Sequence, residues 1–175
     1  MPPVFLDCKT MLILSLIVAT ALALLVHELG HLIAARRLNI PCTELAIGLG
    51  KEFCSFRVGD IRVSLRPLLL GSFVMLDGSL LKKRATHEQL MVHLGGVFLN
   101  LAFGLAAWGT NFGWINLLLA GGNLLPLYQH DGWKCGVVLL RKFMKEPGPS
   151  AEWAFTFSGG FVSLAVGWLV VRMFV

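Results

Sequence analysis

The chain contains a stretch whose residue types and spacing suit metal chemistry, His27-Glu28-Leu29-Gly30-His31. Residues four apart lie on the same face of a helix, so the two imidazoles can bind a single ion together. Glu28 then lies beside the ion without binding it, where a carboxylate can accept a proton from a water molecule. The pattern H-E-x-x-H therefore predicts a zinc site with a general base.

A catalytic zinc ion usually has three protein ligands and one open position, so a third ligand is expected. Asp131 is the acidic residue besides Glu28 that lies well within an otherwise apolar segment. Pro126 interrupts a helix before it, and Gly132 lets the chain turn, so the Asp131 carboxylate can be directed into a cavity. His130 stays an alternative third ligand, because imidazole also suits zinc.

The composition indicates an integral membrane protein. The 175 residues are 56% hydrophobic and 14% charged, with a mean hydropathy of +0.74, whereas a soluble domain carries about 25% charged residues. The net charge of +5 does not indicate a nucleic-acid partner, because the basic residues lie between apolar runs, as in membrane proteins. The four cysteines have no C-x-x-C spacing, so they predict neither a disulfide framework nor a thiolate zinc site.

Four apolar segments are candidates to cross a hydrocarbon core of about 30 Å. We predict an all-α membrane protein with a small β insertion, one domain over 1–175, and spans at about 11–35, 90–108, 114–141 (interrupted) and 153–171. The first span carries the H-E-x-x-H motif. A cleavable signal peptide is its alternative interpretation, but the basic region that should precede such a peptide is missing. Residues 86–89 have capping-box spacing before the second span.

Residues 43–78 are too polar to cross the membrane and too apolar for an ordinary loop. Residues 61–65 alternate between apolar and polar, which is the period of a strand. Gly59 and Asp60 can turn a hairpin between this strand and residues 53–58. Residues 68–76 fit a further strand or a re-entrant piece, which membranes tolerate only against protein or a water-filled cavity. We expect a membrane-associated β-hairpin or re-entrant region at the edge of a polar cavity.

The basic residues predict the orientation of the chain. All but two of the 15 Lys and Arg residues lie between spans one and two or at the junction of spans three and four; the exceptions are Lys9 and Arg172. The positive-inside rule then places both termini outside and both connections in the cytoplasm. His31 is five residues before Arg36, about 7–8 Å along a helix. We therefore expect a multi-pass protein of the cell or inner membrane, with its active site near the cytoplasmic face.

Taken together, the motifs resemble those of the site-2 protease family of intramembrane zinc metalloproteases. That family pairs H-E-x-x-H in one transmembrane helix with N-x-x-P-x-x-x-x-D-G in a later one. The second motif is complete here at Asn123, Pro126, Asp131 and Gly132. Further similarity covers residues 47–50, 69–74 and 96–100.

The resemblance implies roles for five residues. His27, His31 and Asp131 would bind one Zn²⁺ per chain, Glu28 would be the catalytic base, and Asn123 would stabilise the oxyanion or orient the site. The substrate would be a transmembrane protein in the lipid bilayer, and a regulatory membrane partner is compatible with this. The turn between the second and third spans is too short for a PDZ domain, and no residues remain for a CBS domain, so we expect a minimal form of the family.

The motifs leave two alternative functions open. A membrane zinc protease of the prenyl-protein type also has H-E-x-x-H in a membrane helix, but it needs a downstream glutamate ligand. Every later glutamate in this chain lies in a loop or at the edge of a span. A non-catalytic membrane zinc-binding protein would need no general base, whereas Glu28 is intact.

Overall fold

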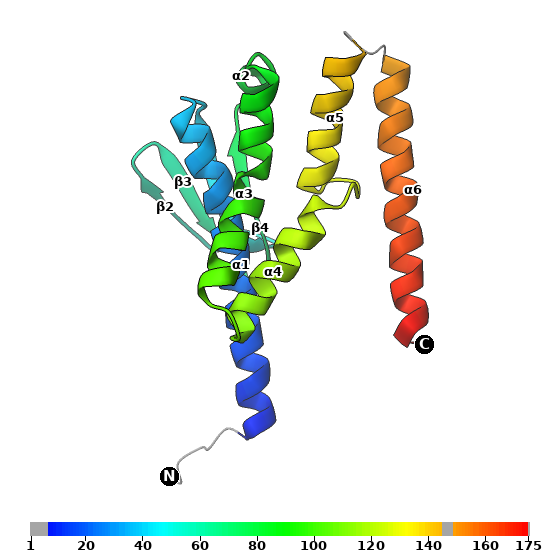
Figure 1. Cartoon of the computed structure of the whole chain (residues 1–175). Coiled ribbons are helices and arrows are strands. Elements are labelled where there is room, and N and C mark those ends of the chain that lie inside the picture. Colours follow the sequence, from blue (N-terminus) through cyan, green and yellow to red (C-terminus); the bar gives the residue numbers. More distant parts are fainter. Residues whose placement is uncertain (1–6, 145–148, 175) are drawn as a thin grey trace.

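The computed structural model describes residues 7–144 and 149–174, and this part of the chain is mostly helical with one small sheet, as predicted (Figure 1). The elements, in chain order, are α1 (Cys8–Arg37), β1 (Cys42–Leu49), β2 (Cys54–Val58), β3 (Ile61–Leu65), β4 (Leu68–Leu76), α2 (Gly78–Lys82), α3 (Thr86–Ala106), α4 (Asn111–Leu124), α5 (Asp131–Phe143) and α6 (Pro149–Phe174).

Helix α1 contains the first predicted span and the H-E-x-x-H motif. The Asp7 side chain caps its start by accepting from the backbone N–H of Thr10 at 3.1 Å. Arg36 and Arg37 lie in its last turn, where cations interact favourably with the helix dipole. Within the described residues, α1 and α3 are the two helices long and apolar enough to cross a membrane.

Helix α3 begins four residues before the predicted second span, at Thr86. The capping box predicted at residues 86–89 is wrong, because Ala85 is the residue that precedes the first turn. Glu88 accepts from the backbone N–H of Ala85 at 3.0 Å, and Gln89 instead donates to the carbonyl of Arg84 at 2.8 Å.

The β region forms a four-stranded sheet in the order β2-β3-β1-β4. Strands β2 and β3 are the predicted hairpin, paired antiparallel with Val58 opposite Ile61. The sheet continues beyond it, because β1 pairs parallel with β3 and antiparallel with β4. The region is therefore larger than a hairpin, and β4 forms one of its two edges.

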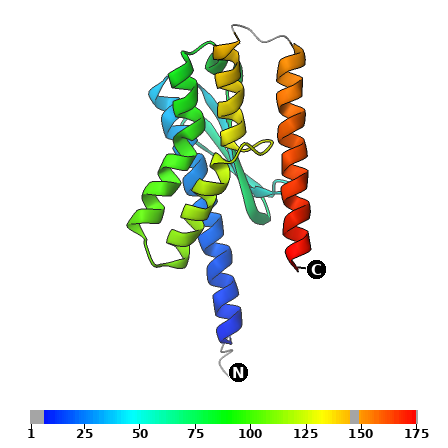
Figure 2. The same ribbon diagram turned by 45° about the vertical axis from the view of Figure 1, so that its right-hand side comes forward.

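One face of the sheet packs against the second half of α1 through an apolar cluster. Its buried members are Leu32, Cys42, Leu45, Ile61 and Val63. In the middle of β4, the hydroxyl of Ser72 donates to the carbonyl of Leu24 on α1 at 3.2 Å. Helix α1 thus contacts the sheet, α3 and α4 (Figure 2). These contacts hold its two histidines in place relative to the sheet and the two helices.

The third predicted segment is interrupted where expected, between α4 and α5. Leu125 has an extended backbone, with φ −65° and ψ 143°, as the residue before a proline prefers. The left-handed turn falls on Gln129, with φ 73°, and not on Gly132 as predicted. Gly132 is needed for space, because a Cβ there would overlap the carbonyl of Leu124.

Helix α6 lies beside α5 and stands apart from α1 in both ribbon views (Figures 1 and 2). Arg141 on α5 pairs with Glu152 on α6, with 2.6 Å between Nε and Oε1. Lower on the helix, the hydroxyl of Ser163 accepts from the backbone N–H of Tyr128 at 2.9 Å. These contacts attach α6 to the segment that carries Asp131.

Candidate metal centre

The two histidines of the motif face one another across one turn of α1. Their Nε2 atoms are 3.2 Å apart, and both side chains are buried. Their spacing of four residues places them on one face of the helix, and that face is turned toward α3 and α5. The prediction that both imidazoles point to a single location is confirmed.

Asp131 reaches the same location from the first residue of α5. Its Oδ2 lies 3.0 Å from Nε2 of His27 and 3.1 Å from Nε2 of His31, and the residue is only 1% exposed. Three potential ligand atoms from positions a hundred residues apart in the chain therefore form a nearly equilateral triangle. Among the described residues, this is the group of His, Cys, Asp and Glu side chains that can hold a metal ion.

The hydrogen bonding of His31 shows why this triangle fits a cation. Its Nδ1 lies 2.8 Å from the carbonyl oxygen of Val92, which can only accept, so Nδ1 carries the proton and Nε2 of the neutral ring has a lone pair. That lone pair faces the Asp131 carboxylate. One proton can bridge only one of the three atom pairs among the two Nε2 atoms and Oδ2. A divalent cation between them can accept a lone pair from all three atoms. Two imidazoles, a carboxylate and an open fourth position are typical ligands of catalytic zinc.

Lys134 forms an ion pair with the other oxygen of the Asp131 carboxylate. Its Nζ lies 3.0 Å from Oδ1 of Asp131, three residues earlier on α5. The carboxylate is thereby held in one rotation, with Oδ1 on the lysine and Oδ2 toward the histidines. Lys134 was not among the residues predicted from the sequence, although its position three residues after Asp131 places the two side chains next to each other on a helix.

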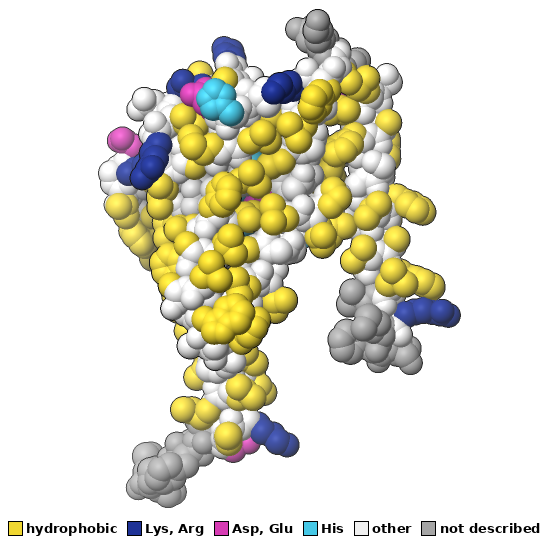
Figure 3. Space-filling view, viewed as in Figure 1, with side chains coloured by type: hydrophobic (Ala, Val, Ile, Leu, Met, Phe, Trp, Pro, Cys, Tyr) yellow, Lys and Arg dark blue, Asp and Glu magenta, His cyan; other side chains and the backbone are white. Residues whose placement is uncertain are grey.

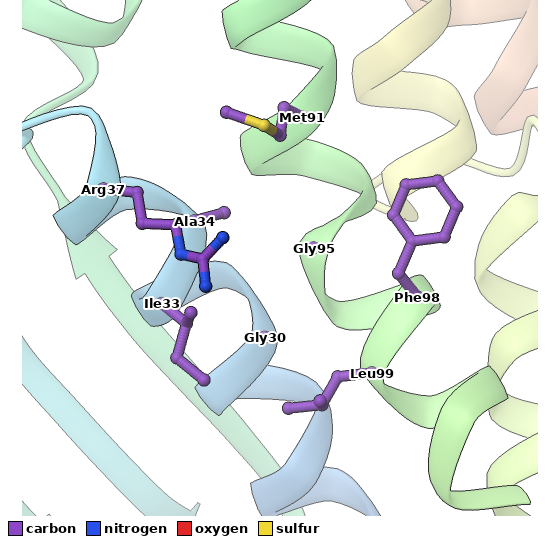
Figure 4. A pocket seen from close by; sticks show the side chains of 8 residues that line it. All are labelled: Gly30, Ile33, Ala34, Arg37, Met91, Gly95, Phe98 and Leu99. Atoms are coloured by element: carbon purple, nitrogen blue, oxygen red, sulfur yellow. The ribbon is translucent and has the colours of Figure 1, made fainter.

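Glycines bring α3 close enough to support the histidines. A Cβ on Gly30 would overlap the carbonyl of Gly95, and a Cβ on Gly95 would lie 2.5 Å from the carbonyl of Gly30. The next residue, Gly96, lies directly against the imidazoles, because a Cβ there would be 2.6 Å from Nε2 of His31. Figure 4 shows the crossing from its apolar side, where a groove lined by Ile33 and other apolar side chains runs past both glycines.

A cavity of about 520 Å³ opens beside the triangle. Glu28 lines it and is partly exposed, as expected for a group that exchanges protons with water. Asn123 lines the same cavity, and its amide donates to the carbonyl of Leu119 at 3.0 Å. On the side of the sheet, residues 71–74 of β4 line the cavity. Their place there agrees with the expectation that the β region borders a polar cavity.

The remaining histidines lie in different places. His130 precedes the first turn of α5 and does not belong to the group that can hold a metal. Its ring contacts the carbonyl of Tyr128 at 3.4 Å. His93 lines the cavity beside the triangle. The turn of α3 that positions it could not be read from a uniformly apolar segment.

Comparison with known proteins identifies similar chains. Residues 15–112, more than half of the chain, match peptidase family M50. Zinc metalloprotease RasP of Geobacillus kaustophilus is 42% identical over 66 residues, which are 38% of this chain and 16% of RasP. The protein all3971 of Nostoc sp., named as a candidate zinc metalloprotease, is 27% identical over 164 residues, covering 81% of this chain and 45% of that protein. The chain thus spans less than half the length of these relatives.

Proposed function

Because the chain belongs to peptidase family M50, the site-2 protease family, we propose that it is a zinc metalloendopeptidase. It cuts a peptide bond in or next to a transmembrane segment of a membrane protein. The observation that carries this proposal is the meeting of His27, His31 and Asp131 beside a cavity that also contains Glu28.

His27 and His31 would hold a zinc ion through Nε2, and Asp131 would hold it through Oδ2. Bound zinc supplies a positive charge that polarises the scissile carbonyl and lowers the pKa of a water molecule. The ligand set is complete without a glutamate, which disfavours the prenyl-protein type of protease.

Glu28 acts as the general base. It follows His27 by one position and lines the cavity where a peptide can enter. It accepts a proton from the attacking water and passes it to the amide nitrogen of the leaving segment as the C–N bond breaks. A non-catalytic zinc-binding protein has no use for this carboxylate.

Asn123 stabilises the carbonyl oxygen of the substrate as it gains negative charge. One N–H of its amide is used by the carbonyl of Leu119, and the same nitrogen has a second N–H to donate. The bond to Leu119 also fixes the direction of the side chain. Asn123 therefore acts as an electrostatic stabiliser of the reacting carbonyl.

The substrate enters as an extended segment and pairs with β4. A transmembrane helix must unwind before its peptide bonds are accessible, and its freed backbone groups then need partners. Strand β4 lies at an edge of the sheet, and its residues 71–74 line the cavity. Addition of a strand at such an edge satisfies the backbone of the bound peptide.

The chain lies in the membrane as a multi-pass protein. Helices α1 and α3 have the length and hydropathy of spans, and we extend this to the α4–α5 pair and α6. Lys and Arg side chains gather at the end of the molecule near α2, while apolar side chains cover the middle (Figure 3). This end faces the cytoplasm, with the active site near it and both termini on the opposite side.

The test is cleavage by Glu28→Gln in cells. The chain is co-expressed with a single-span membrane reporter that carries a different epitope tag on each side, and zinc is measured in the purified protein. We expect zinc to be retained and cleavage to fall by about 10²–10⁴-fold. Glu88→Gln, outside the cavity, is the matched control and should cleave normally. Undiminished cleavage by Glu28→Gln would refute the proposed function.

A further inference from the structure

Several buried polar atoms lie along the helices behind the metal centre without a hydrogen-bond partner. They are Nδ1 of His27, both polar atoms of the Asn100 side chain and Oδ1 of Asn116. Asn100 and Asn116 are fully buried. Such groups are costly inside a membrane protein, because a buried polar atom without a partner loses its hydration without compensation.

The two metal-binding histidines differ in their second hydrogen bond. Nδ1 of His31 donates to the carbonyl of Val92, whereas Nδ1 of His27 has no such acceptor. A histidine that binds a metal almost always donates its other N–H to a carboxylate, a carbonyl or water, which fixes its tautomer and orientation. His27 therefore needs an acceptor that the arrangement of α1 and α3 must provide.

The register of α1 and α3 places Asn100 beside His27. Val92, Gly96 and Asn100 are spaced by four, so they form one row on α3. Val92 binds the ring of His31, and a Cβ on Gly96 would be 2.8 Å from Nδ1 of His27. From Val92 to Gly96, this row therefore passes along α1 from His31 toward His27. Asn100 is the next residue in the row and the first one with a polar side chain.

The register of α3 and α4 places Asn116 beside Asn100. Glycines mark the point where these helices touch: a Cβ on Gly113 would lie 3.1 Å from the carbonyl of Gly104. Asn100 on α3 and Asn116 on α4 each lie one turn from this contact, in the direction of the metal centre. Asn116 donates to the carbonyl of Phe112 at 2.8 Å, so its Oδ1 remains as an acceptor.

We propose that Asn100 is a positioning residue for the metal centre. Its Oδ1 accepts the Nδ1–H of His27, with at most one water molecule between them, and its Nδ2 donates to Oδ1 of Asn116. Each donor in this set has an acceptor, and the proton on Nδ1 leaves Nε2 of His27 with the lone pair that metal binding requires. The proposal rests on the metal site of the proposed function, but not on cleavage.

The experiment measures zinc affinity of the full chain in detergent, by competition with a chelating indicator. Asn100→Leu removes both polar atoms at similar volume and should weaken zinc binding by about 10–100-fold. Asn100→Asp keeps the acceptor and should bind within about threefold of the native affinity, since carboxylates are common partners of zinc-bound histidines. Asn116→Leu keeps Oδ1 of Asn100 as the acceptor but removes the partner that holds the Asn100 side chain. The loss of zinc affinity should therefore be smaller than in Asn100→Leu and larger than in Asn100→Asp.

Ser64→Ala is the matched control, because Ser64 is also fully buried but lies in the sheet, bonded to Glu44. Its zinc affinity should be native. The visible spectrum of the Co²⁺-loaded protein is a second readout, which should change in Asn100→Leu and be restored in Asn100→Asp. Native zinc affinity in Asn100→Leu overturns the proposal. Where Asn100→Leu does not fold, a weakened Asn100→Asp overturns it equally, whatever the result for cleavage by Glu28→Gln.

Discussion

Gly96 offers a sharp test of how α3 supports the metal centre. In Gly96→Ala the new methyl group would lie 2.6 Å from Nε2 of His31 and 2.7 Å from Cε1 of His27. Ordinary contact begins at 3.4 Å, so the rings or the helix must move by about 0.8 Å to remove the overlap. A retreat of α3 would break the close contact of Gly95 with the backbone of Gly30, whereas the histidine side chains can turn about their own bonds. The imidazoles must therefore give way.

A displacement of this size is large for a metal site. Metal–ligand distances hold within about 0.2 Å, and we expect Gly96→Ala to weaken zinc binding by at least tenfold. Alanine also favours a helix over glycine by up to about 1 kcal/mol, so the substitution should not impair α3 itself. Loss of zinc without loss of helix content would then come from the site.

Zinc affinity and thermal unfolding of the purified chain are the assays. Gly121→Ala, where a Cβ would meet no atom within 4 Å, should change neither. Gly104→Ala, whose Cβ would be 2.7 Å from the side chain of Leu117, should affect stability alone, because it lies away from the metal. If Gly96→Ala binds zinc as tightly as Gly121→Ala, the close support of the histidines by α3 is refuted.

Two further predictions concern charged side chains on α5 and α6. Lys134→Met should lower zinc affinity by about 10–100-fold, because it frees Asp131 to rotate; Lys134→Arg should recover most of it, and equal affinities in both variants would contradict the ion pair. The hydrogen bonds from Arg141 hold the pKa of Glu152 below its usual range, so this pair stabilises the fold above the ordinary glutamate pKa of about 4.3 and loses its effect as the pH falls. Arg141→Met should lower the free energy of unfolding by less than about 1 kcal/mol at pH 7, because the pair is partly exposed, and should have no such effect at pH 3. Thermal unfolding at the two pH values measures this. An equal loss of stability at both would exclude the ion pair as its cause.

The sequence predicted what local patterns encode. The apolar run from residue 11 onward, the alternation at 61–65 and the break before Asp131 each correspond to an element of the structure. The H-E-x-x-H spacing predicted that His27 and His31 lie together, because helix geometry alone places residues four apart on one face. Asp131 was identified as an acidic residue at a break in an apolar segment, and it does lie against both histidines.

Other features depend on contacts between distant segments. Strand β1 carries no clear alternation and contains Gly48 with φ +95°, so its place between β3 and β4 is set by pairing that a single segment does not reveal. Gly96 and Asn100 lie in an apolar helix whose buried face is defined only by its neighbours. The role of Gly132 was misread, because glycine is used both for turns and for close approach.

The identity of the metal ligands is the central claim, and X-ray absorption at the zinc edge measures them directly. For the full chain with one bound zinc, we predict two imidazole nitrogens and oxygen ligands at about 2.0–2.2 Å, with no sulfur near 2.3 Å. Asp131→Ala should lower zinc occupancy, while His130→Ala should leave both occupancy and spectrum unchanged. A sulfur ligand, or full occupancy in Asp131→Ala, would contradict the site formed by His27, His31 and Asp131.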